Sequence, residues 1–426
     1  MERTDQMLLQ ALRASLIKKK VNWTGEISRE EWLLLFQKAE MHHILPMVYS
    51  AVYACPVARR MENSLFAPFK KRTVQMITLQ TIKTRAFLNL YQYLREAGLH
   101  PVVVKGMILR ELYPDPDSRA SSDEDVLIRP EEFELCHSRL LEYGMVVRDP
   151  KQDVKDAHEV TYVKPGTMLY IEVHKQLFPP ESEEYGDWNQ FFRNMYECTI
   201  EVPIQGKLIT TLEYTDHFFY LVCHALKHFL HSGFGVRQVC DMVMFANTYG
   251  ERLDWEKILK NCRAIHAERF VAALLQIGKN YLNFQPEKAC YPEQWRRIHV
   301  DETNLLEDLL SGGVYGGASM SRKHSSRITL HAVRAQKKGS RKQAFRNSVW
   351  HTVFPSAGAL KHEYLYLRKY PFLLPVAWVS RLWKYGKENR RESDNQAAES
   401  IRIGRQRVQL MKQYGLIPEN QEHARK

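Results

Sequence analysis

Residues 101–128 place the tightest constraint on how this chain folds. An apolar run of three valines stops at Lys105 and Gly106, and a Pro/Asp/Ser-rich loop then leads through Asp123 and Asp125 into a second apolar run. β-Branched runs bounded by turn residues predict strands. Side chains alternate along a strand, so the two aspartates point to the same face. Paired carboxylates at the mouth of a buried strand favour a bound cation, and we predict that they hold magnesium for a phosphate-transfer reaction.

A third carboxylate lies on a later apolar segment. Residues 169–174 read Leu-Tyr-Ile-Glu-Val-His, and their single acid is Glu172. An acidic side chain in a buried strand is costly unless it is paired or bound to a metal. Three carboxylates from two strands suffice for two Mg²⁺ ions, which clamp the phosphates of a nucleoside triphosphate (NTP) and activate an attacking hydroxyl. We predict that Asp123 and Asp125 bridge both ions and that Glu172 binds the ion at the acceptor.

Residues around the acidic pair are candidates for substrate binding. Lys105 and Gly106 stand between a strand and a helical pattern, where an ammonium and backbone N–H groups meet phosphates. Arg119 lies in the following loop and is a candidate phosphate contact. Ser122 directly precedes the acidic pair and either contacts substrate or caps the strand.

Three further side chains are second candidates. His174 follows Glu172 by two residues and shares its face, where it acts as a proton shuttle, a supporting ligand or a hydrogen-bonded core residue. Lys227 and His228 share one face of a predicted helix with His224, because residues three and four apart are neighbours on a helix. That face either closes over the nucleotide or forms a polar seam between domains.

Apolar periodicity predicts the rest of the architecture. Helical spacings cover residues 1–92 and 213–290, whereas residues 93–212 carry short β-branched runs bounded by turns. Residues 291–342 include a Gly/Ser/Lys-rich flexible linker, and residues 343–426 form a basic helical C-terminal lobe. The predicted strands are 102–104, 126–128, 145–147, 160–163, 169–173, 199–204 and 208–211. The chain is therefore predicted to be α+β: a small mixed β-sheet core flanked by N-terminal and C-terminal helical regions.

Charge and cysteine content limit the possible cellular location of the protein and its possible binding partners. The net charge is +12, and residues 321–426 carry 23 Lys/Arg against 7 Asp/Glu, so this segment alone holds +16. Seven dispersed cysteines without a CxxC motif indicate reduced thiols in a cytoplasmic protein. The N-terminus lacks the apolar core of a signal peptide, and no apolar run reaches the ~20 residues of a membrane span.

The basic C-terminal lobe has three candidate partners. Residues 361–391 mix Tyr, Phe and Trp with Lys and Arg. We rank three interpretations of this composition. The first is packing of the aromatics on the core, the second is peripheral contact with the anionic inner face of the membrane, and the third is nucleic-acid binding.

Together the motifs resemble the nucleotidyltransferase superfamily that includes DNA polymerase β, and more narrowly a bacterial family of uncharacterised nucleotidyltransferases. The resemblance covers roughly residues 25–285 and rests on Val103-Val104-Lys105-Gly106, Arg119-x-x-Ser122-Asp123-x-Asp125, Ile171-Glu172-Val173-His174 and His224-x-x-Lys227-His228. It implies Mg²⁺-dependent transfer of a nucleoside monophosphate from an NTP to an acceptor hydroxyl. The superfamily's usual Gly-Ser turn is Lys105-Gly106-Met107 here, as in the narrower family, so the superfamily pattern does not specify how the triphosphate is bound.

Two alternatives predict different observations. A glycosyltransferase also uses D-x-D to hold the metal of a nucleotide-sugar, but it requires a Rossmann-like domain before the acidic pair, where this chain has helical periodicity. A non-catalytic nucleotide-binding or interaction module would bind NTP without releasing pyrophosphate. The acceptor is not specified by any sequence motif.

Overall fold

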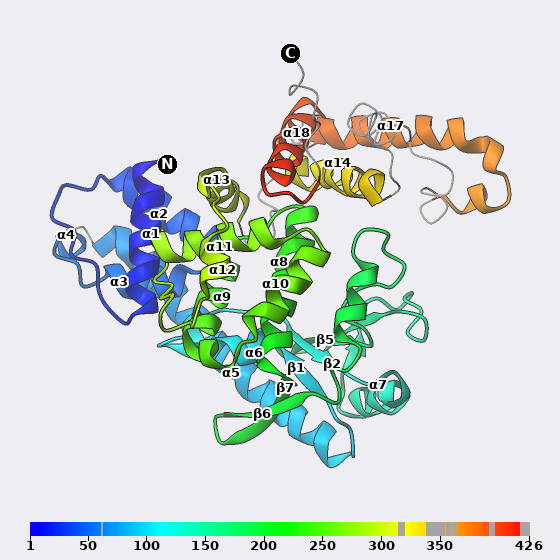
Figure 1. Cartoon of the computed structure of the whole chain (residues 1–426), viewed down its shortest axis with the longest axis horizontal. Helices are drawn as coiled ribbons and strands as arrows, with labels where there is room; N and C mark the ends of the chain where they lie inside the picture. Colours follow the sequence, from blue (N-terminus) through cyan, green and yellow to red (C-terminus); the bar gives the residue numbers. More distant parts are fainter. Residues whose placement is uncertain are drawn as a thin grey trace. The chain divides into compact units, whose positions relative to one another are not determined.

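The computed structural model describes residues 1–60, 63–313, 320–337, 354, 360, 364–391 and 397–417. The chain divides into two compact units (Figure 1). The first comprises Met1–Ala225 and Val236–Glu302, and the second comprises Leu226–Gly235 and Thr303–Lys426. Helix α8 (Tyr214–Leu230) contributes residues to both units.

The N-terminal part of the first unit is helical, as predicted. Its helices are α1 (Arg3–Leu16), α2 (Arg29–Met41), α3 (Leu45–Val52), α4 (Pro56–Arg59) and α5 (Asn63–Glu96). Helix α2 begins at a capping box, because Ser28 Oγ accepts a hydrogen bond from the Glu31 backbone N–H and Glu31 Oε2 accepts one from the Ser28 backbone N–H. Helices therefore occupy the region where the glycosyltransferase alternative requires a Rossmann-like domain.

A five-stranded mixed sheet follows and carries the predicted acids. Its strands are β1 (Val102–Val104), β2 (Glu124–Leu127), β3 (Val146–Val147), β4 (Glu159–Val163) and β5 (Tyr170–His174), in the order β1-β2-β5-β4-β3. Strands β2 and β5 pair in parallel with Asp125 opposite Glu172, and the other pairs are antiparallel. The predicted α+β class with a small mixed sheet is confirmed.

A separate hairpin of β6 (Thr199–Ile204) and β7 (Lys207–Leu212) lies beside β1. Its turn residues Gln205 and Gly206 both have positive φ angles, of 48° and 80°, as a two-residue hairpin turn requires.

The two faces of the sheet have different roles. Val103, Val126 and Val173 point to one face, where they join an apolar core with residues of α5 and of α7 (Phe133–Glu142). Because side chains alternate along a strand, Asp125 and Glu172 point to the opposite face. The first half of α8 lies on that face (Figure 1), where its side chains contact the turn after β1.

The remaining elements of the first unit are short helices and a helical layer. The α-helices are α6 (Gly106–Arg110), α9 (Val236–Tyr249), α10 (Trp255–Ala264), α11 (Glu268–Tyr281) and α12 (Glu293–Arg296). The 3₁₀-helices are η1 (Pro116–Ser118), η2 (Pro130–Glu132), η3 (Gly186–Phe192) and η4 (Gly250–Arg252).

The second unit is helical in its described parts. Its elements are α13 (Thr303–Gly312), α14 (Met320–Lys337), η5 (Leu365–Arg368), η6 (Pro371–Leu373), α17 (Leu374–Arg391) and α18 (Ala397–Gln413). Helices α13 and α14 occupy much of the region for which composition predicts a flexible linker. Arg407 donates to the carbonyl oxygens of Phe229 and His231 and so satisfies the end of α8. Within the described residues, every helix is too short or too polar to cross a membrane.

Candidate functional site

The parallel pairing of β2 with β5 brings three predicted site residues together. His174 Nε2 lies 3.2 Å from Asp125 Oδ1 and 3.9 Å from Glu172 Oε2. One ligand atom from each of these three residues lies within 4.8 Å of the other two. Two carboxylate oxygens and an imidazole nitrogen form a donor set suited to a divalent cation. The cluster of Asp125, Glu172 and His174 therefore fits the metal that the resemblance implies.

Asp123 stands one residue before β2 and shares the electrostatics of this cluster. Burial and the neighbouring Asp125 carboxylate raise the pKa of Asp123 above its usual value. Ser122, at the exposed start of this segment, donates a hydrogen bond to Asp123 Oδ1 over 3.4 Å. The structure thus places Ser122 as a neighbour of the acidic pair, while its contact with substrate stays a prediction.

Lys105 provides a cation at the acidic cluster. Its Nζ lies 2.7 Å from Asp125 Oδ1 and 3.0 Å from Nε2 of His224 on α8. Burial lowers the pKa of Lys105, but Asp125, Tyr220 and Asp123 together outweigh burial and raise the pKa above its usual value. The φ angle of Lys105 is +55°, a region that side-chain-bearing residues rarely adopt. The turn after β1 is therefore shaped to hold this ammonium against Asp125.

The same ammonium keeps Asp125 ionised. Burial raises the pKa of Asp125, but Lys105 and the hydrogen bond with His174 outweigh that effect and lower the pKa below its usual range. Glu172 behaves in the opposite way, because burial and the negative charges of Asp125 and Glu159 raise its pKa to about 7. The cluster therefore holds one firmly ionised carboxylate beside one that is half-protonated near neutral pH, and a divalent cation would favour ionisation of both.

Two residues of the site lie outside the sequence-based prediction. Glu159 on β4 places Oε2 3.4 Å from His174 Nδ1, so it adds a carboxylate to the cluster. His217 on α8 accepts a hydrogen bond from the Lys105 backbone N–H over 3.2 Å and fixes the turn. The register of β4 against β5 and the packing of α8 bring these residues in, and neither is readable from local sequence.

Gly106 is required by close packing beneath the site. A Cβ atom at this position would lie 2.5 Å from Glu124 Oε2. Glu124 points to the core face of β2, where Arg110 pairs with it and Ser121 Oγ donates to it over 3.0 Å. Lys83 Nζ on α5 lies 3.8 Å from the same carboxylate. The alternation of side chains on β2 could have identified Glu124 as a buried acid in need of a cationic partner.

Arg119 is held in a buried ion pair, and its contact with phosphate stays a prediction. Its guanidinium is buried and donates two hydrogen bonds, of 2.8 and 2.7 Å, to the carboxylate of Asp241 on α9. Tyr113 Oη donates a third hydrogen bond to Asp241 over 2.7 Å. This placement gives Arg119 a structural role that anchors the loop before β2, and it provides no support for a phosphate contact.

Lys227 and His228 lie in the last turn of α8 and belong to the second unit. Their predicted contact with the nucleotide stays a prediction.

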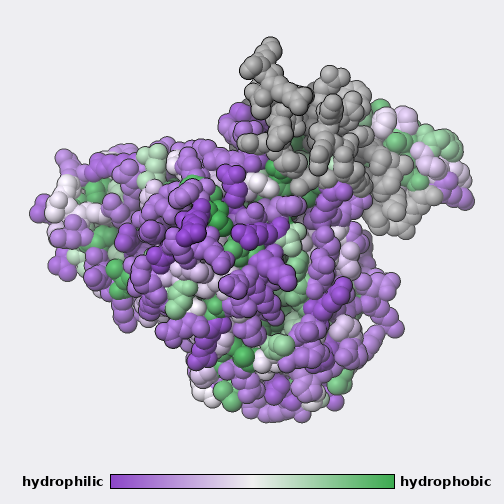
Figure 2. Space-filling view, viewed as in Figure 1, coloured by the Kyte–Doolittle hydropathy of each residue, from purple (hydrophilic) through white to green (hydrophobic). Residues whose placement is uncertain are grey.

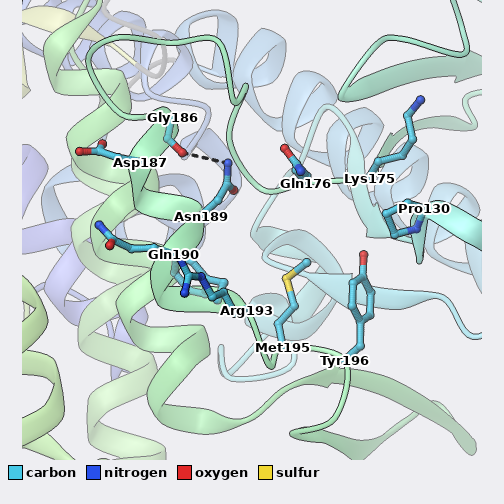
Figure 3. Close-up of a pocket in the computed structure, with 11 residues that line it drawn as sticks. Pro130, Lys175, Gln176, Gly186, Asp187, Asn189, Gln190, Arg193, Met195 and Tyr196 are labelled. Carbon is cyan, nitrogen blue, oxygen red and sulfur yellow. Dashed lines mark hydrogen bonds between the residues drawn. The ribbon is translucent and has the colours of Figure 1, made fainter.

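A pocket of about 530 Å³ opens beyond the carboxyl ends of β2 and β5. Lys175 and Gln176, which directly follow His174, line it together with Pro130, Arg193 and Tyr196 among others (Figure 3). Figure 3 shows Gln176 between the segment that carries Gly186–Arg193 and the side that carries Pro130 and Tyr196. The pocket thus begins directly after the strand that supplies two residues of the acidic cluster.

The fold and the site define an α+β protein whose small mixed sheet holds an acidic cluster suited to a divalent cation, as expected for a nucleotidyltransferase. A family model described as "Uncharacterised nucleotidyltransferase" matches residues 28–283. That range is more than half of the chain and includes the whole acidic cluster, so the chain belongs to this family of uncharacterised nucleotidyltransferases.

Comparisons with individual proteins add little. No curated protein matches the chain. Among solved structures, an antigenic nucleotidyltransferase-like protein from Paracoccidioides brasiliensis is similar at 14% identity, over 46% of this chain and 92% of that one, with a TM-score of 0.29. A similarity of this size carries no argument about the site.

Proposed function

We propose that the protein transfers a nucleoside monophosphate from an NTP to an acceptor hydroxyl in a Mg²⁺-dependent reaction. The observation that carries this proposal is the cluster of Asp125, Glu172 and His174, whose ligand atoms lie within 4.8 Å of one another inside the family match. A divalent cation held there supplies charge neutralisation for the phosphates and acidifies the acceptor hydroxyl. Asp123 together with Asp125 is the proposed site of a second ion.

The chain's own residues bind and orient the two substrates. Lys105 is the proposed partner of the triphosphate, because its ammonium already lies at the acidic cluster and a phosphate oxygen competes with Asp125 for it. Gly106 lets the turn after β1 approach closely, since any side chain there would meet Glu124. With Lys105 and Gly106 in these roles, the triphosphate is proposed to bind at the turn after β1, beside Asp123.

The transfer step moves one proton and one nucleoside monophosphate group. The acceptor oxygen forms a bond to the α-phosphorus while the bond from that phosphorus to the bridging oxygen breaks, and pyrophosphate leaves. Glu172 is the proposed acceptor of the hydroxyl proton, because a cation held at the cluster would keep this carboxylate ionised and therefore able to accept a proton. The acceptor is proposed to enter through the pocket lined by Gln176 and Tyr196 among others, which offers hydrogen bonds to a polar molecule. Its charged lining residues are Lys175, Arg193 and Asp187.

The test is pyrophosphate release with each NTP, Mg²⁺ and a panel of hydroxyl-bearing acceptors. Wild-type protein is expected to release pyrophosphate, and Asp125→Asn is expected to lose the activity. Asp115→Asn is the matched control, because Asp115 is an exposed acid of the preceding loop whose nearest cation, Lys18 Nζ, lies 4.0 Å away. Release by wild type that never exceeds that of Asp125→Asn would contradict the proposal, and NTP binding without release would favour the non-catalytic module.

A further inference from the structure

One face of helix α17 is apolar and exposed. Phe372, in η6 just before the helix, is 74% exposed, and Val376, Val379 and Trp383 are 56%, 68% and 71% exposed. These positions are separated by four, three and four residues, the spacing of a single stripe along a helix. Figure 2 shows hydrophobic surface gathered at this end of the second unit. Large apolar side chains exposed in one stripe mark a contact surface rather than scattered surface residues.

The opposite side of α17 already has an apolar partner. Ala377 is fully buried and joins Leu360 and Leu367 in a small core, against which Leu374 and Trp378 pack. The ring of Trp378 meets that of Phe354 edge-on, with centroids 5.3 Å apart. The helix is therefore held in place by one face, and the other face carries the exposed side chains of Phe372, Val376, Val379 and Trp383. We call this stripe the α17 apolar stripe.

The positive charge of this region indicates that the partner of the stripe is anionic. Helix α17 carries five Lys/Arg and one Asp/Glu, and residues 321–426 carry a net charge of +16. Lys369, next to the start of the stripe, is exposed. An exposed apolar stripe on a helix whose sequence is rich in Lys and Arg matches a membrane interface, where acyl chains receive apolar side chains and anionic headgroups receive cations. Valine side chains offer no such complement to a nucleic acid, which binds through its phosphates and base faces.

We propose that the α17 apolar stripe inserts into the interface of an anionic lipid bilayer, with the helix lying in the plane of the membrane. The surrounding Lys and Arg residues contact anionic headgroups. This inference is independent of the transfer reaction, because no residue of the acidic cluster takes part in it. It gives the basic charge of the C-terminal region a function apart from the substrate site.

The experiment is co-sedimentation of the full-length protein with vesicles. One set contains phosphatidylcholine alone, and the other contains phosphatidylcholine mixed with phosphatidylserine. Wild type is expected to bind the anionic vesicles and to dissociate with added salt, because headgroup attraction is screened. The double variant Phe372→Asp/Val379→Asp is expected to bind on the order of tenfold more weakly, since it removes two inserting side chains and adds negative charge.

The control is Leu208→Asp, which puts one such negative charge at a 60% exposed apolar position on the hairpin of the first unit. It is expected to bind vesicles as wild type does. Since all three positions are exposed, each variant is expected to keep the wild-type thermal unfolding transition. Absence of wild-type binding to anionic vesicles, or equal binding by the double variant and wild type, would overturn the proposal. So would binding of a DNA oligonucleotide in place of vesicles.

Discussion

Replacing Lys105 with methionine tests the electrostatics of the site most sharply. The substitution keeps a long apolar side chain and removes the ammonium that lies 2.7 Å from Asp125 Oδ1. At an effective dielectric constant of about 20, unit charges at this separation attract by about 6 kcal/mol, and loss of one partner of a buried pair costs about 3–5 kcal/mol after solvation is included. We expect the metal-free variant to lose about 3 kcal/mol of unfolding free energy.

A divalent cation is expected to reverse part of that loss. Removal of Lys105 leaves the carboxylate of Asp125 without its competing cation, so the affinity for Mn²⁺ is expected to rise on the order of tenfold, which corresponds to about 1.4 kcal/mol. Urea unfolding in EDTA and in Mn²⁺ measures stability, and electron paramagnetic resonance (EPR) titration measures affinity.

Lys18→Met is the control for this experiment. The Lys18 side chain is 72% exposed and meets its nearest acid, Asp115, at 4.0 Å. Its loss is expected to change neither stability nor Mn²⁺ affinity. Metal-free stability of Lys105→Met close to that of wild type, or weakened Mn²⁺ binding by that variant, would refute the reasoning.

Three more predictions follow from the same geometry. Gly106→Ala is expected to cost about 2 kcal/mol in urea unfolding, because its Cβ would meet Glu124 at 2.5 Å, whereas Gly25→Ala, with open space around it, is expected to be neutral. The pKa of Glu172 is about 7 when folded against a model value of 4.5, so the folded state binds the extra proton between these values and stability falls as pH rises through this window. Glu172→Gln is therefore expected to have a higher unfolding free energy than wild type, by up to about 3 kcal/mol at pH 8 in EDTA. This difference is expected to shrink towards pH 4.5. The same pH dependence of stability in the variant and in wild type would contradict this. Arg119→Met is expected to lose about 3 kcal/mol through its unpaired aspartate while Mn²⁺ affinity is unchanged, and a loss of affinity would indicate a substrate-side role instead.

Local sequence patterns were sufficient for the strands and for the acids that they carry. The strands at 102–104, 126–128 and 169–173 follow from β-branched runs, and alternation along them places Asp125 and Glu172 on the face opposite the apolar core. Strand order is not a local property. The parallel pairing of β2 with β5 depends on which long-range contacts bury the most apolar surface, so the sequence alone could not align Asp125 with Glu172.

Contacts between distant segments account for what the sequence could not show. Lys105 meets His224 across 119 positions, and Arg119 meets Asp241 across 122. A loop arginine near an acidic pair is equally compatible with a phosphate contact and with a buried ion pair, and the ion pair of Arg119 with Asp241 depends on the packing of α9. Composition predicted a flexible linker within residues 291–342, but part of that region forms helix α14. Ile328 and Ala332 are spaced for one face of this helix, and both are buried.

The central claim is that Asp125, Glu172 and His174 form one cation site that serves the nucleotide. Mn²⁺ titration followed by EPR, in the presence of a non-hydrolysable NTP, tests it most directly. Wild type and Asp115→Asn are expected to bind Mn²⁺ alike, whereas Asp125→Asn and Glu172→Gln are expected to bind at least tenfold more weakly, because each removes one ionised oxygen ligand. Unchanged Mn²⁺ binding in both Asp125→Asn and Glu172→Gln would contradict the account.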